Sequence, residues 1–226
     1  MKSRIGKAEY REVMEVKRME EVRRIKVTVI DDMLGTNPAD EKIYKSFIAS
    51  KAPDATTMEE DLQTMSVQEM EDKHMTIFIK DKDGNPMMPN YHMYGFFKSA
   101  CSYLRGIKGT ESEKIKAYKK KIDGLIKVYP DATDVTGRYI PLIMPEGGKI
   151  GNCQRPLRAQ TMQGERVALA NSDTVPAGTS FECDIVLLDP SMWGAVEEWL
   201  NYGKWNGLGQ WRSSGKGAFT WEYVKE

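Results

Sequence analysis

The sequence predicts an α+β fold, in which helices cover one face of an antiparallel β-sheet. Residues 24–30 and 181–188 alternate apolar and polar side chains, which is typical of half-buried strands. Residues 94–106 show helical periodicity instead, with apolar side chains three and four positions apart.

The first half of the chain supplies two strands, a polar insert and two helices. The strand at 24–30 is followed by a turn-rich segment, and 75–79 reads as a second strand. Between them, residues 37–73 are acidic and rich in methionine at helical spacing, which predicts an inserted helical lobe. A helix is expected over 94–106, and a second, strongly basic helix over 112–126.

The second half returns to the sheet. Glycine-punctuated hairpins are expected at about 130–170, followed by the strand at 181–188. A helix then begins after Asp189, a good N-cap, and ends before Gly203. Alternating aromatic residues predict a final strand at 218–224.

This order gives two strand–helix–strand modules around one antiparallel sheet, a ferredoxin-like or RRM-like layout. Residues 1–23 are predicted to be a helical arm or tail, and 24–226 a single domain. The inner faces of the helices and strands predict a buried set: Phe97, Leu104, Ile185, Leu187, Trp193 and Leu200.

Charge and cysteine content narrow the function classes. Lysine plus arginine and aspartate plus glutamate are equal at 33 each, so net charge indicates no partner. The distribution is uneven: 31–72 carries 11 acids against 3 lysines, and 96–127 carries 9 bases against 3 acids. Three well-spaced cysteines predict reduced thiols in the cytoplasm rather than disulfides or zinc. No membrane-spanning run, metal motif, phosphate-binding loop or catalytic triad is recognisable, so no membrane contact, metal or cofactor is expected.

The segment 202–219, YGKWNGLGQWRSSGKGAF, combines glycine with cations and lacks acids. Its spaced glycines permit close backbone approach and positive φ, and its polar side chains offer donors to phosphate. The alternative is a tightly packed structural turn. The glycines of this loop are Gly207, Gly209, Gly215 and Gly217, and its donors are Arg212, Ser213, Ser214 and Lys216.

Four stretches in order resemble the RAMP superfamily, the Cas7-like and Cas5/Cas6-like RNA-binding proteins of CRISPR systems. The glycine loop before a last strand is the C-terminal pattern of that group. TVPAGTSFECDIVLL (174–188) is similar to its lead-in, MPNYHMYGFFKSACSYLR (88–105) to its helix segment, and IKVTVIDDMLGT (25–36) to its first strand and turn. Asn90, Tyr91 and His92 replace the usual Gly-Ser-Ser, and the insert at 37–73 is unfamiliar. Stand-alone chains of this kind resemble phage or prophage proteins.

The resemblance implies a type III Cas7-like protein that holds single-stranded RNA, or single-stranded DNA, by its backbone. It implies self-assembly along the strand as a homo-oligomer or filament, or assembly with other CRISPR-type subunits, and a thumb-like hairpin within 130–170. Trp205 and Trp211 are expected to be exposed and to stack bases, whereas Phe219, Trp221 and Tyr223 are expected in the core. The predicted nucleic-acid-binding residues are Lys98, Arg105, Arg155, Arg158, Trp211, Arg212, Ser213, Ser214 and Lys216.

Two other functions stay open. One is a RAMP-type endoribonuclease, for which His92 as a general base and Asp40 in the loop after the first strand are the candidates. The other is a phage protein that mimics a CRISPR subunit through protein contacts. The basic helix at 112–126 fits either a nucleic-acid groove or a solvated surface.

Overall fold

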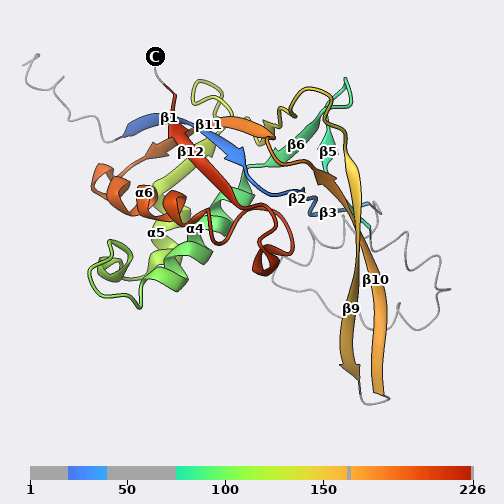
Figure 1. Ribbon diagram of the computed structural model, residues 1–226. Helices are drawn as coiled ribbons and strands as arrows, with labels where there is room; N and C mark the ends of the chain where they lie inside the picture. Colours follow the sequence, from blue (N-terminus) through green and yellow to red (C-terminus); the bar gives the residue numbers. More distant parts are fainter. Residues whose placement is uncertain (1–19, 40–74, 162–163, 225–226) are drawn as a thin grey trace, which may run out of the picture.

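The computed structural model describes residues 20–39, 75–161 and 164–224. Most of the predicted N-terminal arm (1–23) and of the predicted insert (37–73) lies outside these ranges. Within them the protein is a mixed α/β structure with several antiparallel sheets and few helices (Figure 1). None of the helices in this part of the chain is both long and apolar enough to cross a membrane.

The main sheet has four strands in the order β12-β1-β11-β7. They are β1 (Glu21–Val29), β7 (Ile126–Tyr129), β11 (Ser180–Leu187) and β12 (Phe219–Tyr223). Every neighbouring pair is antiparallel. The first strand therefore lies inside the sheet, between two strands from the C-terminal part of the chain.

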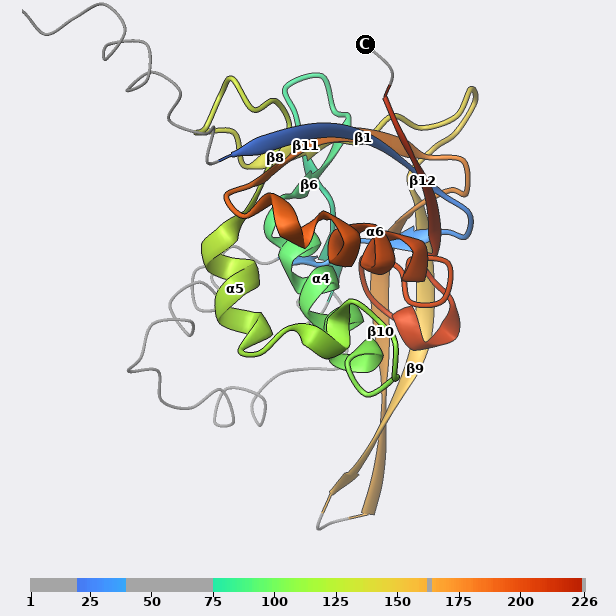
Figure 2. The same cartoon turned by 90° about the vertical axis from the view of Figure 1, so that its left-hand side faces the viewer.

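Two further sheets, one of five strands and one of three, accompany the main one. A long hairpin of β9 (Gly151–Thr161) and β10 (Gly164–Val175) extends away from the other elements (Figures 1 and 2). At its base, β10 pairs with β2 (Met33–Leu34) and with β4 (Thr76–Ile77), which in turn pairs with β3 (Asn37–Pro38). The third sheet contains β5 (Ile79–Lys80), β6 (Pro86–Pro89) and β8 (Tyr139–Pro141).

Helices cover one face of the main sheet (Figure 2). They are α4 (Tyr91–Leu104), α5 (Tyr118–Leu125) and α6 (Trp193–Tyr202), with one-turn helices at η2 (Ser112–Lys114), η3 (Pro190–Met192) and η4 (Arg212–Ser214). Asp189 is an N-cap, as predicted, but it caps the one-turn helix η3, which directly precedes α6. Its Oδ1 accepts a hydrogen bond from the backbone N–H of Ser191. Gly203 caps the C-terminal end of α6.

The predicted core is largely confirmed. Phe97, Ile185, Leu187, Trp193 and Leu200 are buried, whereas Leu104 is only partly buried at the end of α4. Aromatic rings join the layers. Phe96 of α4 packs edge-on against Phe219 of β12, and Phe97 packs against Trp199 of α6.

The predicted basic helix over 112–126 is wrong as a single helix. Ile115 is extended and Ala117 has φ 52°, so the chain breaks between η2 and α5. Only Tyr118 and Ile122 of α5 are buried, and its lysines face solvent. A segment with so little apolar surface has no reason to form one long packed helix.

The aromatic residues of β12 share the helix-facing side of the sheet. Phe219, Trp221 and Tyr223 pair with Val29, Val27 and Ile25 of β1. Phe219 is buried, but Trp221 is half-buried and Tyr223 is exposed, so the core prediction is wrong for Tyr223.

The opposite face of the sheet carries charges instead. There, Arg24 pairs with Glu182 at 3.1 Å and with Asp184 at 3.3 Å. The β12 aromatic residues therefore form no stacking platform on the open face of the sheet.

Candidate nucleic-acid interface

The glycine loop, residues 203–218 between α6 and β12, doubles back on itself. The backbone N–H of Leu208 donates to the carbonyl of Gly217 at 2.9 Å. A Cβ on Gly207 would overlap the backbone of Gly217, and a Cβ on Gly217 would overlap the carbonyl of Leu208. These two glycines therefore allow the two arms of the loop to touch. This packing role supports the alternative of a tightly packed structural turn for these two positions.

The other two glycines have separate roles. Gly209 has φ 81°, and a Cβ there would lie 2.5 Å from the carbonyl oxygen of Leu34 in β2, so it lets the loop approach the second sheet. Gly215 has φ 84° and ends η4, with only the Asp31 carboxylate near its open side. Gly215 is needed for its backbone conformation rather than for space.

Lys216 anchors the loop to the turn after β1. Its Nζ lies 3.0 Å from Asp31 Oδ1 and 3.7 Å from Asp32 Oδ2. The Lys216 hydrogen bond holds the pKa of Asp31 below its ordinary value, and the same bond raises the pKa of Lys216. The backbone N–H of Gly217 also donates to the carbonyl of Asp32 at 2.9 Å. A cation predicted to bind phosphate thus already has carboxylate partners.

This anchor predicts a pH-dependent contribution to stability. Because the pKa of Asp31 is lowered on folding, its contribution is present above the unfolded value and is lost as pH falls through the folded value. We expect Asp31→Asn to lower the unfolding midpoint at neutral pH and to leave it unchanged in acid well below pH 3.8. Thermal unfolding at both pH values checks this, with the exposed turn variant Asp83→Asn as control. An equal effect of Asp31→Asn at both pH values would contradict it.

Arg155 ties the hairpin to the loop. It is only 8% exposed, and its guanidinium donates to Ser172 Oγ of β10 at 3.2 Å and to Gln210 Oε1 of the loop. The same guanidinium lies 5.6 Å from the ring centroid of Trp211. Trp211 has φ 56°, a left-handed conformation that bulky residues rarely adopt. The contacts that Arg155 of the hairpin makes with the loop therefore lie at a strained backbone position, Trp211.

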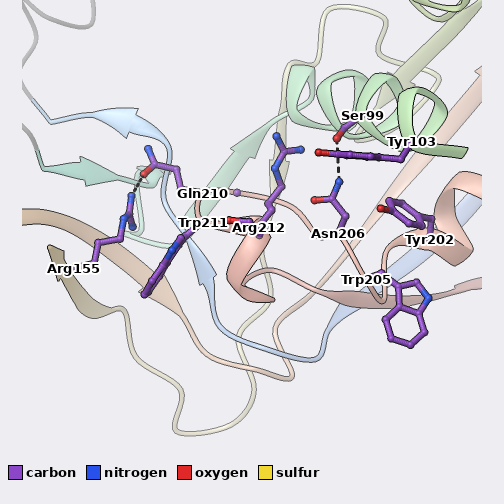
Figure 3. A pocket seen from close by; sticks show the side chains of 11 residues that line it. Ser99, Tyr103, Arg155, Tyr202, Trp205, Asn206, Gln210, Trp211 and Arg212 are labelled. Carbon is purple, nitrogen blue, oxygen red and sulfur yellow. Dashed lines mark hydrogen bonds between the residues drawn. The ribbon is translucent and has the colours of Figure 1, made fainter. Parts of the chain in front are cut away.

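A groove of about 630 Å³ lies between this loop and the ends of α4 and α6 (Figure 3). Its lining contains two arginines, four aromatic residues and several neutral polar groups, and within the described residues it contains no aspartate or glutamate. A second depression of about 330 Å³ adjoins it and shares Gly209 and Arg212. The main lining side chains are Ser99, Tyr103, Arg155, Tyr202, Trp205, Asn206, Gln210, Trp211, Arg212 and Ser213.

Arg212 is the cation common to both depressions. Its side chain is half-buried and forms no ion pair or hydrogen bond with any residue that the structure describes. Figure 3 shows it directed from the loop toward Ser99 of α4, between Trp211 and Asn206. It is thus placed to receive an anion in the groove.

The other predicted residues are not all brought together. Lys98 lines the second depression, but its Nζ pairs with Asp123 Oδ1 at 2.5 Å. Arg105, at the C-terminal end of α4, lies over the ring of Tyr118 at 5.3 Å and outside both depressions. Ser213 lines the groove, and Ser214 is exposed. The side chain of Arg158 lies outside the described part of the molecule.

Of the two catalytic candidates the structure describes only His92, which lines the second depression together with Lys98 and Arg212. His92 Nε2 lies 2.7 Å from Thr36 Oγ1, and its ring packs against Tyr91. Asp40 lies outside the described residues. No group of three histidine, cysteine or acidic side chains suited to a metal ion occurs within 20–39, 75–161 and 164–224.

The cysteines form no disulfide. Cys101, Cys153 and Cys183 are all free thiols. Burial raises the pKa of Cys183 to about 12, so it packs in the core as a neutral thiol.

Sequence reasoning missed half of the groove. Tyr103 and Ser99 lie on the exposed side of α4, and Tyr202, Asn206 and Gln210 flank the predicted loop residues. One sequence feature indicates this part of the groove: Tyr103 lies outside the apolar stripe of its helix, which predicts an exposed aromatic ring. The expected exposure of Trp205 and Trp211 is confirmed, at 76% and 42%.

Comparison with known proteins gives distant structural likenesses. No protein-family model matches the chain, and no curated protein matches it. One similar structure is a chain of the type III-B Cmr-beta complex bound to cognate target RNA, at 12% identity and TM-score 0.48; the likeness covers 96% of this chain and 64% of that one. The crystal structure of Cmr6 from Pyrococcus furiosus is similar at 11% identity and TM-score 0.44, over 92% of this chain and 100% of that one. This chain therefore spans about two thirds of the first of these chains and the whole of the second.

Proposed function

We propose that the protein binds single-stranded RNA in the groove between the glycine loop and α4. The observation that carries this proposal is Arg212, a cation with no partner among the described residues, in a lining that has exposed aromatic rings and no acid. Proteins that hold single strands combine a cationic groove with aromatic rings on which bases stack. Trp211 and Arg212 supply one of each, next to each other.

The contacts available in this groove favour recognition of the backbone. Phosphate contacts position a strand but carry no sequence information. The strained backbone at Trp211 adds support, because such strain persists only where surrounding contacts hold it and often accompanies function. We therefore expect weak sequence preference, and we propose RNA rather than DNA as the ligand.

The proposal includes a RAMP-like identity for residues 24–226 as one domain. Helices lie between β1 and β7 and between β11 and β12, and the strand order β12-β1-β11-β7 is the one expected for two interleaved strand–helix–strand units. These features support a ferredoxin-like core, and the β9–β10 hairpin takes the place of the thumb. Self-assembly along the strand, or assembly with other CRISPR-type subunits, belongs to the same proposal.

Binding to short labelled RNA at increasing salt tests the function. We expect log affinity to fall linearly with log salt, by about 0.7 for each phosphate neutralised on a single strand. Duplex RNA of the same sequence and the matching DNA strand serve as comparisons. Absence of binding at low salt, or an affinity that salt does not change, would refute the proposed function.

A further inference from the structure

Three aromatic side chains gather at the end of the groove away from Arg155. Tyr103 comes from the end of α4, Tyr202 from the end of α6, and Trp205 from the start of the glycine loop (Figure 3). Tyr103 is 65% exposed and Trp205 is 76% exposed. Folding leaves this much aromatic surface of Tyr103 and Trp205 in water, at the edge of a concave site, whereas Tyr202 is partly buried against the core and fixes the position of the cluster.

We propose that Tyr103, Tyr202 and Trp205 form a stacking site for an unpaired nucleobase, and that Arg212 binds the phosphate beside it. This inference rests on the proposed RNA-binding function and adds a base-binding position to it. It is separate from Trp211, which lies on the other side of Arg212 (Figure 3). The groove thus has an aromatic surface on each side of one cation, the combination of stacking rings and positive charge that single-strand binders use.

Ring geometry indicates where the base lies. The centroids of Tyr103 and Tyr202 are 6.2 Å apart, and their planes are tilted by 37°. Parallel insertion of a base would need about twice the 3.4 Å spacing of stacked bases, with the rings parallel. The two tyrosines therefore form a single wall. Trp205 makes no ring contact among the described residues and is 76% exposed, so a face of its indole ring is free for a base to stack on.

Neighbouring polar groups favour a nucleobase over an apolar protein segment. Asn206 Nδ2 donates to Ser99 Oγ at 3.0 Å, and this bond holds the amide at the groove wall. The amide oxygen of Asn206 forms no hydrogen bond among the described residues, so it remains an acceptor for the edge of a base. An apolar protein partner would bury that acceptor and the Arg212 guanidinium without compensation.

Alanine variants and an abasic probe test the site. Trp205→Ala and Tyr103→Ala are each expected to weaken binding of a labelled oligouridine RNA by roughly 5- to 150-fold. The salt slope should not change, because neither variant removes a charge. Trp205→Phe should restore part of the affinity. Tyr139→Ala, an exposed tyrosine of β8 outside the groove, is the matched control.

The abasic probe, a strand with the same ribose-phosphate backbone but no bases, separates this inference from the proposed function. If wild-type protein binds it as tightly as oligouridine, and Arg212→Ala weakens both, the groove holds RNA but the stacking site is refuted. If neither probe binds, both proposals are refuted. If Trp205→Ala keeps its RNA affinity but changes the mass of the protein in solution, the aromatic cluster is a protein contact and the stacking site is refuted. Loss of oligouridine affinity in the variants, with unchanged unfolding midpoints, supports the inference.

Discussion

Arg212→Ala is expected to weaken RNA binding about ten- to a hundredfold, the largest loss from any single charge in the groove. Hydrogen bonds to charged groups contribute about 1.5–3 kcal/mol each, and each 1.4 kcal/mol is a factor of ten in affinity. Arg212 has no competing partner among the described residues, whereas Lys98 and Lys216 are paired with carboxylates. The variant should also flatten the plot of log affinity against log salt by about 0.7.

Two variants bracket this result. Arg138→Ala removes an exposed arginine that lies over Tyr129, outside the groove, and should leave both affinity and salt slope as in the wild type. Lys216→Ala should lower stability through loss of the Asp31 contact, with a smaller effect on binding than Arg212→Ala. Fluorescence anisotropy over a salt series measures all three. Wild-type affinity in the Arg212 variant would remove the observation that carries the proposed function.

Of the variants proposed, Gly217→Ala is expected to lower the free energy of unfolding the most. Gly217 has φ 71°, and an added Cβ would overlap the carbonyl of Leu208. The unfavourable φ costs about 1–3 kcal/mol, and forced overlap in a packed region costs about 1–3 kcal/mol more. Since domains of this kind are stable by only about 5–15 kcal/mol, the change consumes a large part of the total.

Gly84→Ala is the matched control for that variant. Gly84 has φ 84°, but nothing lies within 4 Å of an added Cβ. It therefore incurs the conformational cost without the overlap, and should be clearly less destabilising in urea unfolding. Equal losses in the two variants would mean that the arms of the loop separate easily, and that glycine at 217 serves its φ angle alone.

The sequence predicted the strands and the helix that follow from the periodicity of apolar residues within one short segment. Alternation in 24–30 and 181–188 corresponds to β1 and β11, and the apolar stripe in 94–106 corresponds to α4. The prediction of one helix over the basic stretch at 112–126 is wrong, because only Tyr118 and Ile122 of α5 pack into the core. Ala117, with φ 52°, breaks this stretch, and no residue type at that position signals a left-handed backbone.

The candidate site was predictable only in part, because its contacts join distant residues. Lys216 and Asp31 are 185 positions apart, so a free cation in the sequence becomes a paired one in the fold. Tyr103 and Tyr202 meet only because α4 and α6 end side by side. Trp205 and Trp211, by contrast, lie in a polar loop with little apolar surface around them. Their exposure depends on the local sequence and was correctly predicted.

The interior position of β1 governs the order in which the chain can fold. Arg23 of β1 donates to Tyr223 Oη of β12, 200 residues later, and the other neighbour of β1 begins at Ser180. During synthesis β1 emerges well before its partners, and both of its pairing edges stay unfilled until residues 180–223 have been made. Such distant pairing carries a high contact order, which slows folding relative to helical proteins of similar stability. The β9–β10 hairpin, whose strands are neighbours in sequence, needs no such wait.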